Sequence, residues 1–201
     1  MATIVQTPDA SDEDAREKGD GSSYSSTENN VFFSANVTSD QENWGATRFK
    51  SMTIPPGATI NSCTIECYVV SAVRDDPDLH LYFEDADDPV DFSSNADVIG
   101  RPLTTARTAW SDTSVGTGLE TSPDFAAAAQ EVIDRPGWAS GNAMMVIGVG
   151  TNDTNQLFRV AGWDHPSYDP IELTITYTPF VYYPRPRGTD GGMMLLGGGV
   201  Q

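Results

Sequence analysis

Residues 59–71, TINSCTIECYVVS, form the longest stretch of this chain whose pattern indicates a β-strand. Side chains at alternate positions of a strand share one face, and here one face carries only apolar and thiol groups. These are Cys63, Ile65, Cys67 and Val69. The same alternation recurs in residues 78–84 (DLHLYFE) and 171–178 (IELTITYT). Together the three stretches predict strands with one buried face each, which is typical of antiparallel sheets.

Further strand patterns lie on both sides of residues 59–71. They cover residues 30–35, 46–54, 104–110, 142–150 and 156–163. About eight short strands at this spacing predict an all-β fold, an antiparallel β-sandwich of the jelly-roll type. One short helix is expected to begin at Ser122, with Pro123 and Asp124 in its first turn, and to end before Pro136.

The composition of the two ends predicts arms outside the sandwich. Residues 1–22 are mostly polar and acidic, so we expect an N-terminal arm, followed by the sandwich domain over residues 23–179. Residues 180–201 (FVYYPRPRGTDGGMMLLGGGVQ) are expected to form an extended C-terminal arm, since residues before proline favour extended backbone. Exposed apolar and arginine side chains there predict contact with a partner. The predicted partner-binding residues are Phe180, Val181, Tyr182, Tyr183, Arg185, Arg187, Met193, Met194, Leu195 and Leu196.

The charge of the chain limits its partners. It has 29 acidic and 11 basic residues, a formal net charge of −18. Such a chain is unsuited to nucleic acid or to an anionic membrane surface, because both require basic patches. Abundant Asp with only two Lys is typical of proteins that stay soluble at very high salt, which indicates a halophilic host. An ordinary acidic surface protein is the alternative.

The two cysteines are predicted to be buried free thiols. Cys63 and Cys67 lie four positions apart on the predicted strand, about 13 Å at ~3.3 Å per residue. A disulfide requires Cα atoms within about 7 Å, so the two thiols cannot bridge each other. Small buried thiols behave as apolar groups in a core.

The most credible ion ligand is calcium, because four carboxylates cluster in residues 85–94 (DADDPVDFSS), and hard cations bind several carboxylate oxygens. The candidate ligands are Asp85, Asp87, Asp88 and Asp91. A solvated acidic surface explains the same residues without any ion. No other cofactor is expected. An enzyme is not predicted either, since His80 and His165 are the only histidines and no GxSxG motif is present.

Two segments resemble a known family. Residues 43–69, NWGATRFKSMTIPPGATINSCTIECYV, resemble the opening of the DNRLRE-type β-sandwich domains of cell-surface and virion proteins. Residues 132–148, VIDRPGWASGNAMMVIG, are similar to that family's Trp followed by a Gly-Asn turn and an apolar strand. An ITY-type strand at residues 175–177 closes the resemblance, which spans about residues 25–178. It implies a binding or structural role and transfers no catalytic residues.

The resemblance implies a structural protein of a tailed virus. We therefore expect a capsid decoration or cement (or turret) protein, made in the host cytoplasm without a signal peptide and located in the virion. Its expected partners are copies of itself, as a trimer or pentamer, and a major capsid protein. The alternative is a carbohydrate-binding or adhesion module of a tail, fibre or cell surface. Its candidate glycan platforms are Trp44, Trp110, Trp163 and Tyr168.

Overall fold

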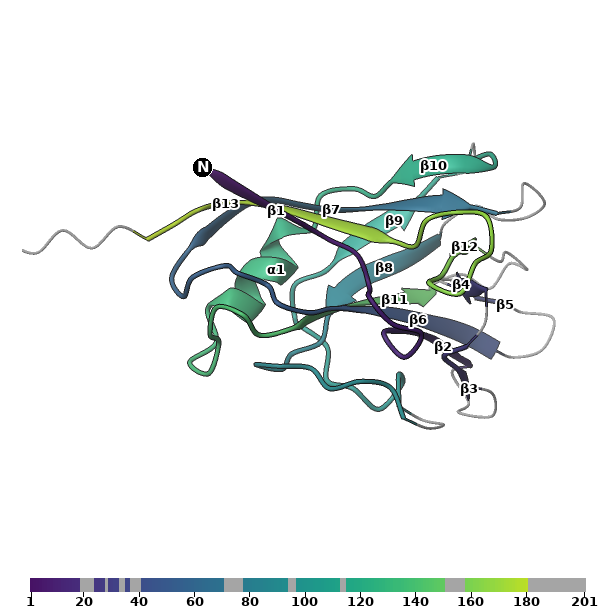
Figure 1. Cartoon of the computed structure of the whole chain (residues 1–201), viewed down its shortest axis with the longest axis horizontal. Coiled ribbons are helices and arrows are strands. Elements are labelled where there is room, and N and C mark those ends of the chain that lie inside the picture. Colours follow the sequence, from purple (N-terminus) through teal and green to yellow (C-terminus); the bar gives the residue numbers. More distant parts are fainter. Residues whose placement is uncertain are drawn as a thin grey trace, which may run out of the picture.

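Two antiparallel β-sheets form the body of the protein, as seen in a computed structural model (Figure 1). The structure describes residues 1–18, 24–27, 29–32, 35–36, 41–70, 78–93, 97–112, 115–150 and 158–180. Sheet A contains, in order, β1 (Ala2–Gln6), β13 (Glu172–Thr178), β7 (Thr59–Val69), β12 (Arg159–Ala161) and β4 (Asn30–Phe32), and β10 (Gly118–Thr121) also pairs with β7. Sheet B contains β3 (Tyr24–Ser25), β2 (Asp14–Lys18), β6 (Gln41–Phe49), β11 (Met144–Gly150), β8 (Asp78–Phe83) and β9 (Thr108–Ser111), and β5 (Ala35–Asn36) pairs with β6.

The predicted β-sandwich is confirmed, and the alternating stretches explain how it is held together. β7 buries the predicted face, from Cys63 to Val69, against the inner face of sheet B. Leu79, Leu81 and Phe83 of β8 meet it from the other side as part of the same core cluster. Burial of a large apolar side chain stabilises a fold by roughly 1.5–3 kcal/mol, so this shared core is the main stabilising element.

A second, smaller core explains why β11 is apolar on both faces. Met144 and Val146 join the main core, whereas Met145 and Ile147 pack with Phe92 and Val98 on the outer side of sheet B. Residues 84–93 and 97–103 therefore cover this outer face. The nearly continuous apolar run of β11 is the pattern expected of a strand that is buried on both sides.

The single described helix, α1 (Ala126–Ile133), begins later than predicted. Ser122 does not cap it, because its hydroxyl accepts a hydrogen bond from the backbone N–H of Ile65 at 3.0 Å. Asp124 accepts from Ala126 and from Cys63 on β7, so residues 122–125 run extended beside that strand. Phe125 and the inner face of the helix are buried against the core.

The prediction of an N-terminal arm over residues 1–22 is wrong for most of its length. β1 pairs with β13 in sheet A, from Ala2 opposite Tyr177 to Gln6 opposite Leu173. β2 pairs with β6 in sheet B and buries Glu13, Asp14 and Glu17. The acidic composition predicted an exposed segment. Instead, its backbone pairs with both sheets, and its buried carboxylates have hydrogen-bond or ion-pair partners there.

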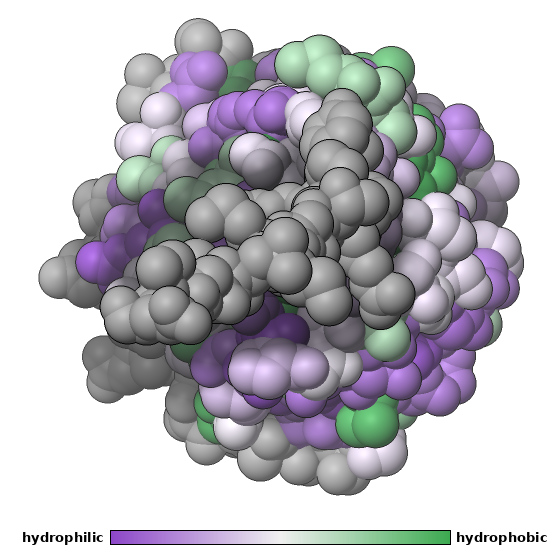
Figure 2. Space-filling view, turned by 90° about the vertical axis from the view of Figure 1, so that its left-hand side faces the viewer, coloured by the Kyte–Doolittle hydropathy of each residue, from purple (hydrophilic) through white to green (hydrophobic). Residues whose placement is uncertain are grey.

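The N-terminus and the end of β13 lie at the same end of the sandwich (Figure 1). Met1 is 90% exposed and Phe180 is 67% exposed there. Phe180 lies beside Gly57 in the predicted turn before β7, where the positive φ of 73° suits glycine. Figure 2 views this end face on, and its described surface mixes hydrophilic areas with small hydrophobic ones. We call it the terminal end.

Both cysteines are free and buried, as predicted. Burial raises the pKa of each thiol well above its usual value. Trp138, which the sequence places between the helix and β11, is also buried, and its indole N–H donates to the carbonyl of Ile54 at 3.0 Å. Within the described ranges, no helix is long and apolar enough to cross a membrane.

Candidate ligand-binding groove

A groove of about 380 Å³ lies on the outer face of sheet A, at the opposite end of β7 from the terminal end. Its floor is built from outward-facing residues of β7 and β13, because alternate residues of these strands point away from the core. β10 supplies one side, and residues 163–170 after β12 supply the other. Its main lining residues are Glu66, Tyr68, Leu119, Trp163, Asp169 and Glu172.

Exposed aromatic side chains gather at this groove. Trp163 is 41% exposed, and Leu119, directly opposite Tyr68 in the β7–β10 register, is 64% exposed. The Tyr68 ring stacks on Tyr168 with centroids 3.6 Å apart, and Tyr168 in turn stacks on His165 at 4.8 Å. Aromatic rings at a surface present flat apolar faces together with polar edges, which suits binding to amphipathic ligands.

The segment that carries Trp163 is fastened to the body at several points. The backbone N–H of Trp163 donates to Oδ2 of Asp14 on β2, at 2.6 Å. Asp164 accepts from the Ser11 hydroxyl at 2.7 Å. His165 Nδ1 accepts from the backbone N–H of Ser167 and Tyr168, at 3.2 and 3.1 Å. These contacts hold the Trp163 backbone and the Tyr168 ring in place before any ligand arrives.

Asp14 is an unusual anchor because it is almost completely buried between the sheets. Burial raises the pKa of its carboxyl to about 7, and the nearby charges of Asp164 and Glu13 add to this, while the hydrogen bond from Trp163 lowers it. Gly162 leaves room for this carboxyl, since a Cβ there would lie 2.8 Å from its Oδ2. The groove is therefore linked to a group that titrates near neutral pH.

Three carboxylates give the groove its charge. Glu66 and Glu172 stand directly opposite each other in the β7–β13 register, and Asp169 lines the same cavity. No hydrogen bond or ion pair joins any of the three to another described residue, and none of the described lining residues is basic. Like charges directly opposite each other destabilise a sheet, so the Glu66–Glu172 pair does not contribute to the stability of the fold.

The structure separates the four predicted glycan platforms. Trp163 and Tyr168 lie at the groove. Trp110 is 5% exposed and packs edge-on against Phe158 in the main core, so it cannot serve as a platform. Trp44 is partly buried against the second core. The predicted strand over residues 104–110 contained Trp110, but its pattern did not show that this side chain is buried. Trp44 precedes the predicted strand over residues 46–54, and the structure places it on β6.

The predicted calcium ligands do not converge. Asp85 and Asp87 both bind Arg135, and Asp91 binds Arg48. Asp88 accepts from the backbone N–H of Ala143 at 2.8 Å. No group of three possible ligands is arranged for a metal ion within the described ranges. Here these carboxylates hold residues 85–91 against the body of the protein, a role that the abundance of acidic residues did not reveal.

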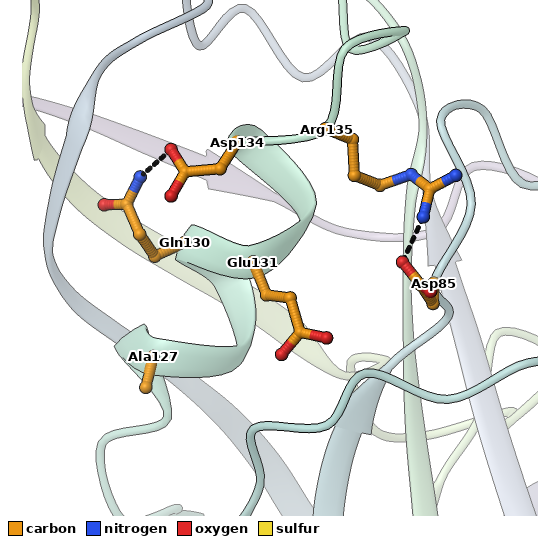
Figure 3. A pocket seen from close by; sticks show the side chains of 6 residues that line it. All are labelled: Asp85, Ala127, Gln130, Glu131, Asp134 and Arg135. Atoms are coloured by element: carbon orange, nitrogen blue, oxygen red, sulfur yellow. Dashed lines mark hydrogen bonds and ion pairs between the residues drawn. The ribbon is translucent and has the colours of Figure 1, made fainter.

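A second cavity, of about 550 Å³, opens beside α1 (Figure 3). Its polar side chains already have partners: Gln130 binds Asp134 and Arg135 binds Asp85, the two contacts drawn in the figure. Glu131 accepts from the backbone N–H groups of residues 105 and 106, both at 2.8 Å. These groups stabilise the ends of α1 and its neighbouring loop, and they leave the first groove as the better candidate.

Of the predicted partner-binding residues, only Phe180 belongs to the described part of the chain. The others lie outside it, namely Val181, Tyr182, Tyr183, Arg185, Arg187, Met193, Met194, Leu195 and Leu196. Phe180 is largely exposed at the terminal end, so the C-terminal arm begins far from the groove. Sequence reasoning missed Glu66, Tyr68 and Glu172 as site residues, although their outward alternation on strands was visible.

Comparison of the sequence with models of known protein families found no match, and comparison with curated proteins found none either. The resemblance to DNRLRE-type domains therefore stays a prediction. The fold and the groove define a class of protein: a β-sandwich with an aromatic and acidic surface groove at one end, and with its N-terminus and the end of β13 at the other.

Proposed function

We propose that this chain is a non-catalytic structural protein of a virion, a capsid decoration or cement (or turret) protein that attaches by its C-terminal arm. The observation that carries this proposal is the start of the arm at the terminal end, where Phe180 is 67% exposed. An exposed aromatic side chain at the root of an apolar and basic segment favours burial against a partner. The groove would then face outward.

The span of β7 supports this two-ended arrangement. Thr59 pairs with Thr178, next to Phe180, whereas Glu66 pairs with Glu172 in the groove. Thr59 and Glu66 are separated by about 23 Å, at ~3.3 Å per residue. One end of the sandwich is thus free to contact a capsid protein or a second copy, as in a trimer or pentamer, while the other end stays accessible. The dense acidic charge of the chain keeps such an outer surface soluble.

A non-catalytic role also fits the histidines. His165 uses Nδ1 to accept two backbone N–H groups, which orders its loop. His80 lies on β8 of sheet B, and both cysteines are buried. Burial raises the pKa of both thiols and so keeps them protonated, the unreactive form.

Deleting residues 180–201 tests the structural proposal. We expect the truncated protein to fold, because β13 ends at Thr178, and to be lost from purified particles. Copies per particle are measured by quantitative mass spectrometry, and far-UV circular dichroism checks the fold. Trp163→Ala is the matched control, since it alters the groove at the other end and leaves incorporation unchanged. Undiminished incorporation of the truncated chain would contradict the proposal.

A second candidate function is favoured by the groove itself: a carbohydrate-binding module. Aromatic faces stack on the apolar faces of sugar rings, and carboxylates accept hydrogen bonds from hydroxyl groups. Trp163, Tyr68 and Glu66 offer both kinds of contact within one cavity whose volume suits a small ligand. The two functions are compatible, because a decoration protein that binds glycans would use opposite ends for the two tasks.

A glycan array tests this second candidate. We expect binding by the wild type and a loss of about tenfold or more with Trp163→Ala, the usual cost of removing a central aromatic contact. Phe180→Ala, which truncates an exposed aromatic at the terminal end, should leave glycan binding unchanged. Equal binding by wild type and Trp163→Ala would remove the groove from consideration.

A further inference from the structure

We infer that the groove selects an amino sugar, a pyranose ring that carries a protonated amine, over neutral and acidic sugars. The inference rests on the proposed carbohydrate-binding function and names the class of sugar that the charges of the groove favour. It starts from Glu66 and Glu172, which face each other across two paired strands of sheet A. Nothing in the described part of the chain neutralises them.

The carboxylates of the groove differ from the buried acids of the fold in the partners that they have. Glu13 binds Arg48 and Lys50, and Glu84 binds Arg101. Glu17, although buried, accepts from the backbone N–H groups of residues 98 and 99, at 2.8 and 3.1 Å. The fold thus gives its buried acids cationic or N–H partners. The three acids of the groove are more exposed, and no described residue pairs with any of their carboxylates.

Charge complementarity then decides the ligand. Antiparallel neighbours that stand directly opposite each other have Cβ atoms about 5 Å apart, so Glu66 and Glu172 hold their charges close together. A cation between them relieves this repulsion, and Asp169 adds a third negative charge to the same cavity. An acidic sugar would meet three like charges and no basic lining residue, so the groove rejects it.

The aromatic residues indicate that the cation belongs to a ring and is not a bare metal ion. Trp163 and Leu119 are exposed and line the same groove as the carboxylates, and the Tyr68 ring, which also lines it, stacks on Tyr168. Apolar and aromatic surface contributes little to binding a hydrated metal ion, whereas it stacks on a sugar ring and attracts an organic cation. An amino sugar can contact both kinds of group in the groove: its ring stacks on the aromatic side chains, and its ammonium group pairs with the carboxylates.

Three trisaccharides of equal length test this inference by titration of the intrinsic tryptophan fluorescence, since Trp163 is exposed while Trp110 and Trp138 are buried. They are a glucosamine trimer, its fully acetylated and neutral form, and a galacturonic acid trimer, measured with the full chain at low salt. We expect the glucosamine trimer to bind about tenfold more tightly than the acetylated trimer, a difference of about 1.4 kcal/mol. We expect no binding of the galacturonic acid trimer.

Glu66→Gln keeps the size of the side chain and removes one charge. We expect it to weaken binding of the glucosamine trimer several-fold and to leave the acetylated trimer unaffected, whereas Asp12→Asn, an exposed acid outside the groove, changes neither. Equal or tighter binding of the acetylated or galacturonic acid trimer overturns the inference and leaves carbohydrate binding standing. If no sugar binds, both fail. If spermidine binds as tightly as the glucosamine trimer, the groove recognises charge without a sugar ring, and the inference is overturned.

Discussion

The buried carboxyl of Asp14 makes the stability of this protein depend on pH in an unusual direction. Burial raises its pKa in the folded state from 3.8 to about 7. Between these two values the folded chain holds a proton that the unfolded chain has released, so stability falls as pH rises through this window. Below pH 4 the carboxyl is protonated in both the folded and the unfolded state. Above pH 7 it is ionised in both states, and the full free-energy cost of burying the carboxylate lowers stability. Asp14→Asn removes this titration.

The size of the effect follows from the same two pKa values. A difference of about three pH units, at roughly 1.4 kcal/mol per unit, corresponds to about 4 kcal/mol as an upper value. The amide of asparagine can still accept the backbone N–H of Trp163 through its oxygen, and its own N–H₂ group offsets part of the gain because it is left without an evident acceptor. We therefore expect Asp14→Asn to be more stable than the wild type by about 2–4 kcal/mol at pH 8, and equal to it or up to about 2 kcal/mol less stable at pH 4, where only the cost of the unpaired amide remains.

Urea denaturation at several pH values between 4 and 8 measures this difference. Comparison with the wild type at each pH cancels the titration of all other groups, which is essential in a chain of net charge −18. Asp12→Asn, an exposed acid two positions away, serves as the control and should shift stability by less than about 0.5 kcal/mol at every pH. Because burial is the largest cause, the effect should persist in 2 M NaCl, where screening removes only the smaller contributions of Asp164 and Glu13. A difference between Asp14→Asn and wild type that stays constant from pH 4 to pH 8 would refute this reasoning.

Three further outcomes are expected. Glu84→Ala should lower the free energy of unfolding by roughly 3 kcal/mol in urea, because it leaves Arg101 buried without its 2.7 Å partner. Cys63 and Cys67 should fail to react with a colorimetric thiol reagent in the native protein and react fully in denaturant, since both are buried and their pKa is raised; rapid native reaction would contradict this. Trp138→Phe should cost about 1–3 kcal/mol, seen as a lower thermal midpoint, because a buried backbone carbonyl loses its 3.0 Å donor.

The groove and the terminal end can be tested independently because they lie on opposite ends of β7. Truncation at residue 180 removes the arm without touching Trp163, and Trp163→Ala alters the groove without touching the arm. Loss of particle incorporation with retained sugar binding, or the reverse, assigns each task to one end. Loss of both from either variant alone would indicate a single shared surface.

Much of the sandwich was predictable from local pattern. The alternation of residues 59–71, 78–84 and 171–178 predicted β7, β8 and β13 to within about two residues, and the inward faces are correct. The prediction failed for β1 (ATIVQ) and β2 (DAREK), since five residues without a clear apolar alternation do not reveal a strand within a polar segment. The helix boundary failed at Ser122 because a residue that suits a helix cap can equally serve a neighbouring strand.

The sequence by itself determined the fold class, the buried and unbridged cysteines, and the strongly acidic charge of the chain. Period-two patterns and total charge are properties of neighbouring residues and of composition, so they can be read without a structure. Only the tertiary structure decided which carboxylates have partners and which aromatic side chains are exposed. Asp85, Asp91 and Glu66 are all acidic residues of an acidic chain, but the tertiary fold brings an arginine to each of the first two, and strand pairing places Glu172 opposite the third. Such pairings join residues far apart in the chain, and no local pattern encodes them.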